Sequence, residues 1–196
     1  MYGAEAVVEP CTFFSIPCVA KKRLPKSYRA YALDSKLRKE RTKLEARVMQ
    51  RAKSTGTMCP LVLSVDIAKC EIIQTRLGGE KLVNRLDKKP NDSTALQNAG
   101  VQLARLHSAG ISHGDSTTSN FMVDEEKVYI FDFGLSQFDA SLEDQAIDLL
   151  LFFKSVSLEQ FKHFVSGYRS ECGEKETQKL LTQVAEIQSR ARYVER

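Results

Sequence analysis

The chain has no tryptophan, only three histidines and only five cysteines in 196 residues. The cysteines are scattered, odd in number and never spaced as Cys-x-x-Cys, which argues against a disulfide framework and against a structural zinc site. Free thiols are typical of a reducing compartment, so we expect a protein of the cytoplasm, and of the nucleus where one exists. Three histidines also make a His-based metal site unexpected.

Long hydrophobic runs are absent as well. No stretch approaches the roughly 20 apolar residues that a membrane-spanning helix needs. The most apolar run, from Ile147 to Phe153, is interrupted by Asp148, and the N-terminus has no basic-then-apolar signal pattern. We therefore expect no membrane partner. The hydrophobic fraction of 42% is enough for the core of one domain.

The net charge of +4 is unevenly distributed along the chain. Residues 21–53 contain 13 Lys or Arg and 3 Asp or Glu, a local balance of +10, whereas the remainder of the chain has a balance of −6. A segment with this charge is suited to the phosphates of RNA. A solvated helix surface explains the same charges, and the sequence leaves both interpretations open.

Apolar periodicity and turn residues predict strands first and helices later. We expect one domain over 1–196, an α+β fold with two lobes: a small β-rich lobe at 1–77 and a reduced helical lobe with a short basic tail at 78–196. In chain order the expected elements are short strands within 1–20 broken at Pro10 and Pro17, a basic loop over 24–31, a helix capped by Asp34 and ending near 53, strands over 61–65 and 71–75, a loop over 88–93, a helix from Asp92 or Ser93 to 107, short strands over 121–123 and 128–131, and helices from about 142.

One constellation points to a specific chemistry. Asp115, Asn120 five residues later and Asp132-Phe133-Gly134 twelve residues after that are typical of a kinase phosphoryl-transfer centre. Asp115 is expected to accept the proton of a hydroxyl group or a water molecule. Asn120 and Asp132 are expected to bind Mg²⁺, since hard oxygen ligands suit that ion. The pattern predicts that the two-lobed domain over 1–196 is protein-kinase-like, with ATP and Mg²⁺ as cofactors.

Lys21 and Glu45 are the expected lysine–glutamate pair of such a centre. Lys21 follows the apolar Val19-Ala20 pair in a predicted strand, and Glu45 lies 24 residues later in a predicted helix. The glutamate is expected to hold the lysine against the nucleotide phosphates. The short Gly3-Ala4-Glu5 stretch stands where kinases have a glycine-rich loop, so these backbone amides are expected near the phosphates.

Two features lie after the Asp-Phe-Gly motif. No Ala-Pro-Glu follows it, and a helix is predicted from about Leu142, which leaves no room for a peptide-docking platform. Asp148 falls within an apolar helical segment, where a carboxylate needs partners. We expect Asp148 to accept hydrogen bonds from the backbone amides of the catalytic loop.

Together these motifs resemble the small atypical kinases of the Bud-thirty-two/PRPK family, the kinase subunit of the KEOPS (EKC) complex. The resemblance covers nearly the whole chain and includes residues 113–120 and 132–136. Its specific part is the Lys-x-Arg-x-Pro-Lys-x-Tyr-Arg run at 21–29, which general kinases lack.

The resemblance implies an ATPase with weak serine/threonine kinase activity that supports threonylcarbamoylation of adenosine in tRNA. It implies three partners: a threonylcarbamoyl-transferase subunit, a small subunit that binds the N-lobe, and tRNA contacted through a basic surface. It also implies that Gln74, Thr75 and Leu77 border the adenine, although the family usually has Met-Glu-Tyr at 74–76. The tail is less basic than is usual in the family.

Two other functions stay open at this point. A small-molecule phosphotransferase needs an acceptor pocket, and the short helical lobe leaves little material for one. A non-catalytic scaffold for the transferase subunit and tRNA is favoured by the reduced glycine loop and the altered hinge. The intact set of candidate catalytic residues opposes the scaffold: Lys21, Glu45, Asp115, Asn120 and Asp132.

Overall fold

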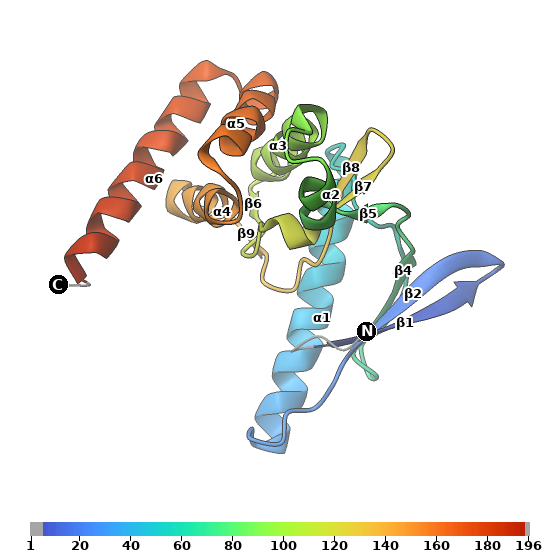
Figure 1. Cartoon of the computed structure of the whole chain (residues 1–196). Coiled ribbons are helices and arrows are strands. Elements are labelled where there is room, and N and C mark those ends of the chain that lie inside the picture. The colour runs from blue at the N-terminus through green and yellow to red at the C-terminus, as the bar shows by residue number, and fades with distance from the viewer. Residues whose placement is uncertain (1–5, 195–196) are drawn as a thin grey trace.

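The computed structural model describes residues 6–194, with side chains up to residue 190 (Figure 1). The N-terminal part is a four-stranded antiparallel sheet with the strand order β1-β2-β4-β3 and one long helix beside it. Its elements are β1 (Ala6–Phe13), β2 (Ile16–Arg23), α1 (Tyr31–Ser54), β3 (Val62–Asp66) and β4 (Glu71–Thr75).

The prediction that Pro10 and Pro17 break the first strands is wrong. Strand β1 runs through Pro10 and β2 includes Pro17. Proline lacks the N–H that an inner strand must donate, but Pro10 lies in β1, the edge of the sheet, where the missing donor costs no pairing. Pro17 lies in β2 but before Cys18, where the pairing of β2 with β4 begins. The chain reverses instead at Phe14 and Ser15, both of which have positive φ.

Helix α1 begins earlier than predicted. Its N-cap is Ala30, and Asp34 lies in the first turn rather than before it. The Asp34 carboxylate binds the Arg38 guanidinium at 2.7 Å and the Lys26 backbone amide at 3.3 Å, so it ties the preceding loop to the helix. Helix α1 contacts β3 and β4, and Val48 is among its fully buried residues.

The C-terminal part is mainly helical. Its small sheets have the orders β5-β7-β8 and β6-β9. The elements are β5 (Glu80–Lys81), α2 (Leu82–Lys88), α3 (Ser93–Ser108), β6 (Ile111–Ser112), the 3₁₀ helix η1 (Thr118–Asn120), β7 (Phe121–Asp124), β8 (Lys127–Ile130), β9 (Gln137–Phe138), α4 (Leu142–Lys154), α5 (Leu158–Cys172) and α6 (Glu174–Val194).

Two helix starts in this part confirm the prediction. Asp92 is the N-cap of α3 and its side chain accepts a hydrogen bond from the Ala95 amide. Helix α4 begins at Leu142, and Ser141 and Asp144 form a capping box there. The short helix α2 has no counterpart in the prediction. It ends at Lys88, where the expected polar loop begins.

Helices α3 and α5 form the centre of the core. They approach closely because each presents a glycine: a Cβ at Gly100 would lie 2.0 Å from the Phe164 carbonyl oxygen, and one at Gly167 would lie 1.9 Å from the Gln97 carbonyl oxygen. Phe152 of α4 stacks on Phe164 with ring centroids 3.8 Å apart. Within residues 6–194 no helix has the length and apolar character to cross a membrane.

The architecture confirms the predicted α+β class, with strands first and helices later (Figure 1). The link from β4 to β5, residues 76–79, contains the predicted lobe boundary at 77/78, which stays a prediction.

Candidate functional site

Lys21 lies between two carboxylates that come from distant parts of the chain. Its Nζ is 2.5 Å from Oε1 of Glu45 on α1 and 2.7 Å from Oδ1 of Asp132. The Lys21 and Glu45 side chains are only 9% and 2% exposed, whereas the Asp132 side chain is 50% exposed. The structure therefore brings together three of the residues that the sequence marked as candidates.

The ion pairs keep Lys21 and Asp132 charged at neutral pH. Burial lowers the pKa of Lys21, but Glu45 and Asp132 outweigh that effect and raise its pKa above 10.5. Burial likewise raises the pKa of Asp132, and the Lys21 ammonium outweighs it, so the pKa of Asp132 lies below 3.8. The Asp132 contribution to stability is therefore lost only below about pH 4, and that of Lys21 only above about pH 10.5.

Arg23 shares Glu45 with Lys21. Its Nη2 lies 2.5 Å from Oε2 of Glu45, and the Arg23 side chain is 5% exposed. The motif pattern alone assigns Arg23 no part in the site. The alternation of side chains along a strand could have identified Arg23, because it lies two residues after Lys21 in β2 and therefore points to the same face of the sheet.

The Asp132-Phe133-Gly134 segment has a constrained backbone. Asp132 has φ of 67°, a left-handed conformation that Asp tolerates better than most residues. A Cβ at Gly134 would lie 3.2 Å from Arg23 Nη2 and 3.3 Å from Asp132 Oδ1. Glycine at 134 therefore leaves room for the Arg23 and Asp132 side chains.

Asp115 and Asn120 form a second group. The Asn120 Nδ2 donates hydrogen bonds to the Asp115 backbone oxygen at 2.7 Å and to Asp115 Oδ2 at 2.8 Å. Since the amide nitrogen is used in this way, the Asn120 side chain has its carbonyl oxygen left for other ligands. The Phe131 amide donates to the Asn120 backbone oxygen at 3.0 Å, which ties this loop to the residue before Asp132.

The donor set at this site fits Mg²⁺. Asn120 Oδ1 and the half-exposed Asp132 carboxylate are hard oxygen ligands, and Mg²⁺ in nucleotide sites takes one or two carboxylates together with phosphate oxygens and water. Asn120 and Asp132 would hold the ion, which would neutralise phosphate charge. No group of three or more His, Cys, Asp or Glu within the described part of the chain is placed to hold a metal by itself.

Asp148 of α4 anchors the loop that carries Asp115. Its carboxylate, with 0% exposure, accepts hydrogen bonds from the backbone amides of His113 at 2.6 Å and Gly114 at 2.8 Å, and lies 3.0 Å from His107 Nε2. These contacts confirm the prediction for Asp148. Burial raises the pKa of Asp148, but its hydrogen bond with His107 and the neighbouring donors outweigh burial and lower the pKa.

We expect Asp148→Asn to destabilise the protein in a pH-dependent way. The amide replaces one of two acceptor oxygens with a donor that faces backbone N–H groups, at a cost of about 3 kcal/mol at pH 7. The pKa of Asp148 is lowered in the folded protein, so its stabilisation exists above pH 3.8 and is lost as the pH falls further. Urea unfolding of both proteins at pH 7 and pH 3 measures this. A difference in unfolding free energy that stays the same at both pH values would contradict the assigned role.

The hinge candidates lie at the end of β4 and just after it. Gln74 pairs with Val19 and Ile72 with Lys21, so Gln74 is on the same face of the sheet as Lys21. Gln74 Oε1 is buried and has no hydrogen-bond partner among residues 6–194. Thr75 Oγ1 accepts from the Leu61 amide at 2.9 Å. Leu77 follows the strand, and the candidates Gly3, Ala4 and Glu5 lie outside the described residues.

His107 of α3 supports Asp148 together with the catalytic-loop amides, and it has a second partner. Its Nδ1 lies 2.8 Å from the Tyr168 hydroxyl, while its Nε2 faces Asp148. The network therefore extends from α5 through α3 and α4 to the catalytic loop. The sequence contains no spacing signal for Tyr168, since it comes from a helix 61 residues away.

Comparison with known proteins identifies the family. The RIO domain family matches residues 21–151, about two thirds of the chain. The "KEOPS complex subunit Bud32" of Pyrococcus abyssi is 38% identical over 209 residues, which cover 99% of this chain and 95% of that protein. The chain belongs to the Bud32 family of RIO-domain proteins. A Bud32 homolog of Archaeoglobus fulgidus, named as a probable serine/threonine-protein kinase, is 36% identical over 184 residues, which cover 91% of this chain and 89% of that protein.

Other Bud32-family relatives are much longer. A "Probable bifunctional tRNA threonylcarbamoyladenosine biosynthesis protein" of Methanobrevibacter smithii is 35% identical over 198 residues. The match covers 97% of this chain but 36% of that protein, so the chain spans about a third of such bifunctional relatives. The family assignment confirms the resemblance inferred from the motifs.

Solved structures confirm the kinase-like fold. The chain matches a Rio2 kinase–ADP/Mg²⁺-phosphoaspartate complex from Chaetomium thermophilum with a TM-score of 0.65 and 15% identity, over 96% of this chain and 70% of that one. It also matches WaaP in complex with acyl carrier protein, with a TM-score of 0.65 and 14% identity, over 100% and 88% of the two chains. At these identities the likeness concerns the fold alone.

Proposed function

We propose that this chain binds ATP with Mg²⁺ and hydrolyses it as the kinase-like subunit of a complex that makes threonylcarbamoyladenosine in tRNA. One observation carries the proposal: the buried Lys21 joins the buried Glu45 to the half-exposed Asp132 carboxylate, beside a loop in which Asn120 bonds to Asp115. A scaffold needs no such arrangement of charges, and burying them is costly without a use.

The candidate catalytic residues have the following roles in this proposal. Lys21, fixed by Glu45, donates to the phosphate oxygens of ATP. Asp115 accepts the proton of the attacking water, or of a serine or threonine hydroxyl in a weaker kinase reaction. Asn120 orients the Asp115 carboxylate through its amide. Catalysis is then mainly positioning and charge neutralisation, as in other phosphoryl transfers.

The adenine is expected at the β4 end of the sheet. Gln74 Oε1 is a buried acceptor without a partner in the described residues, and an exocyclic amino group supplies the donor that it lacks. Thr75 and Leu77 border the same position, and the amides of residues 3–5 are proposed to approach the phosphates.

Partners and location complete the proposal. The names of the relatives support a multi-subunit tRNA-modifying complex. We propose a threonylcarbamoyl-transferase subunit as the main partner, a small subunit on the N-terminal sheet, and tRNA on a basic surface. The cytoplasm, and the nucleus where one exists, is the proposed compartment, and the five cysteines are free in the structure.

Phosphate release from ATP tests this function. We expect Mg²⁺-dependent turnover by the full chain that rises when the transferase subunit and tRNA are added. Asp132→Asn should lower turnover at least 100-fold, because an amide is a much weaker ligand for Mg²⁺ and a weaker partner for Lys21. Asp139→Asn is the matched control, since Asp139 also has positive φ but is exposed and lies outside the site.

Two results would overturn the proposal. Normal turnover by Asp132→Asn would exclude the metal role. No turnover in any mixture, with the complex assembled, would favour the scaffold.

A further inference from the structure

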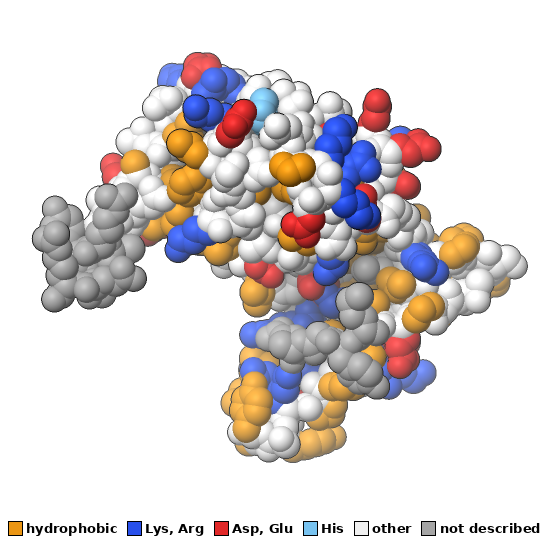
Figure 2. Space-filling model, viewed as in Figure 1, with side chains coloured by type: hydrophobic (Ala, Val, Ile, Leu, Met, Phe, Trp, Pro, Cys, Tyr) orange, Lys and Arg blue, Asp and Glu red, His pale blue; other side chains and the backbone are white. Residues whose placement is uncertain are grey.

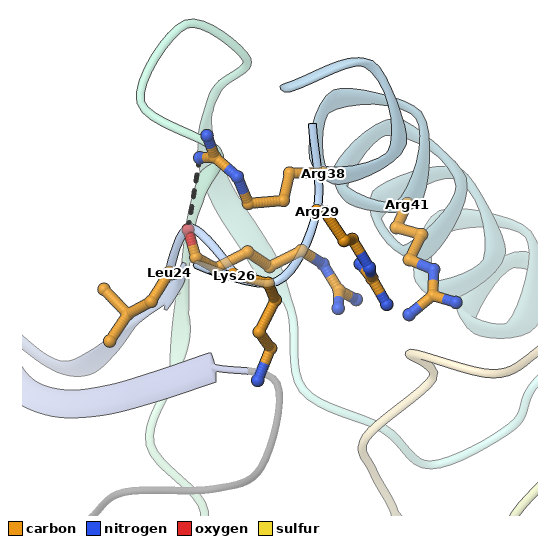
Figure 3. Close-up of a pocket in the computed structure, with 6 residues that line it drawn as sticks. Leu24, Lys26, Arg29, Arg38 and Arg41 are labelled. Carbon is orange, nitrogen blue, oxygen red and sulfur yellow. Dashed lines mark hydrogen bonds between the residues drawn. The ribbon is translucent and has the colours of Figure 1, made fainter. Parts of the chain in front are cut away.

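A pocket rich in arginine lies where the chain enters α1. The arginine pocket is formed by the end of β2, the loop at 24–30 and the first three turns of α1. Its lining residues are Arg23, Leu24, Lys26, Arg29, Arg38 and Arg41. Figure 3 shows that the Arg29 and Arg41 guanidinium groups point toward the same space, and that the Lys26 ammonium lies on the same side.

Asp34 organises the arginine pocket. Its buried carboxylate, 2% exposed, accepts from Arg38 at 2.7 Å and from the Lys26 backbone amide at 3.3 Å, and lies 3.8 Å from Arg29. The hydrogen bond from Arg38 is the main reason that the pKa of Asp34 is lowered. Arg38 also donates to the Arg23 backbone oxygen at 3.5 Å, so the loop is closed against the helix (Figure 3).

The cations of the arginine pocket are gathered by the fold rather than spread over a surface. Arg23 is 4% exposed, and the Arg29 and Arg38 side chains are 24% and 16% exposed. Guanidinium groups held in one place favour phosphate, because their fork geometry matches its oxygens. A solvated helix face explains exposed lysines, but it does not explain why the partly buried Arg29 and Arg41 point into one space, while Arg38 turns to the Arg23 backbone oxygen (Figure 3).

Two exposed tyrosines belong to the segments that form the arginine pocket, Tyr28 to the loop and Tyr31 to the first turn of α1. Tyr28 is 74% exposed and Tyr31 is 83% exposed, and the Arg29 guanidinium lies 5.2 Å from the centre of the Tyr28 ring. Proteins that bind single-stranded nucleic acids commonly use exposed aromatic rings beside basic groups, because the bases stack on the rings and the phosphates pair with the cations. Figure 2 shows basic and apolar side chains together on the projection formed by the N-terminal end of α1.

We propose that the arginine pocket binds a backbone phosphate of single-stranded RNA, with Tyr28 and Tyr31 stacking on the flanking bases. This inference deepens the proposed function, because it gives the tRNA a contact on the N-terminal part. It also places RNA next to the catalytic centre. Arg23 lines the pocket, pairs with Glu45 and lies 3.2 Å from the Cβ position of Gly134.

Fluorescence anisotropy with a short labelled single-stranded RNA tests the pocket. In the full chain we expect Arg29→Gln/Arg41→Gln to weaken binding at least tenfold and to reduce the salt slope by about 0.7 for each phosphate that the variant no longer neutralises. The matched control is Lys43→Gln/Arg51→Gln, which removes two exposed charges from the same helix. Neither Lys43 nor Arg51 has a carboxylate partner in the described part of the chain. Equal losses in both double variants would overturn the proposal, because they would reflect net charge alone.

Tyr28→Ala separates RNA from other anions. We expect it to weaken RNA binding about fivefold or more, because one base no longer has a ring to stack on, and to leave the weak competition by inorganic phosphate unchanged. Competition by an acidic or phosphorylated peptide that matches RNA, with no effect of Tyr28→Ala, would indicate a protein partner and contradict the inference. Thermal unfolding of each variant checks its fold.

The inference and the proposed function fail separately. RNA binding that survives in Asp132→Asn, while turnover is absent from every mixture, would keep the arginine pocket and reject the ATPase. Normal turnover together with RNA binding that the pocket variants do not change would reject the pocket and keep the ATPase.

Discussion

Glu45→Gln lowers the stability of the protein by about 3 kcal/mol and removes most ATP turnover. Glu45 is 2% exposed and is the shared carboxylate of Lys21 and Arg23, both nearly buried. Breaking a buried pair by removing one partner leaves uncompensated charge, which is a large cost. For a chain of this length, about 3 kcal/mol corresponds to a fall in Tm of roughly 6–12 °C. Calorimetry and the phosphate-release assay measure both effects.

Glu40→Gln is the matched control on the same helix. Glu40 is exposed and lies 4.0 Å from Lys36 in an i, i+4 pair, which contributes about 0–1 kcal/mol. We expect a Tm within about 4 °C of the wild-type value. Equal melting temperatures for the Glu45 and Glu40 variants would mean that the buried cluster does not stabilise the fold.

Asp115→Asn lowers turnover by about 10²–10⁴-fold and leaves ATP affinity and Tm nearly unchanged. The amide cannot accept the proton of the attacking water, but its oxygen still accepts the hydrogen bond from Asn120, and the backbone bond from Asn120 to residue 115 is unaffected. The loop itself is held by Asp148 rather than by the Asp115 carboxylate. Stopped-assay turnover and nucleotide titration separate the two quantities.

Asp139→Asn, at an exposed position outside the site, is again the control for removing one acidic charge. Wild-type turnover in Asp115→Asn would exclude Asp115 as the base. A turnover loss that tracks an equal loss of ATP affinity would assign Asp115 to binding instead.

Much of the site could be predicted because its chemistry is local in sequence. Asp115, Asn120 and Asp132 have a spacing that only a few folds use, and the Asp148 contacts follow from the rule that a buried carboxylate needs donors. Lys21 and Glu45 are 24 residues apart, but a strand followed by a helix made their pairing a reasonable expectation.

The remaining features depend on tertiary context. Proline usually interrupts a strand, and Pro10 is accommodated only because β1 is the edge of the sheet. Asp34 has the residue type of an N-cap, yet Arg38 and the Lys26 amide draw it into the first turn. The short helix α2 has no cap hydrogen bond from a side chain, so no start signal marks it.

The arginine pocket shows the same limit. The excess of basic residues at 21–53 is visible in the sequence, but which of them converge is decided by the loop at 24–30 folding onto α1 around Asp34. Sequence spacing alone does not separate Arg29 and Arg41, which line the pocket, from the exposed Lys43 and Arg51.

Calorimetric titration of ATP into the full chain, with and without Mg²⁺, tests the central claim most directly. Wild type and the Asp139→Asn control should bind ATP much more tightly when Mg²⁺ is present, and Asp132→Asn should lose that dependence, because two neutral amide oxygens bind Mg²⁺ much more weakly than a site that includes a carboxylate. The same Mg²⁺ dependence in Asp132→Asn as in wild type would contradict the assignment of this site to Mg²⁺ and ATP.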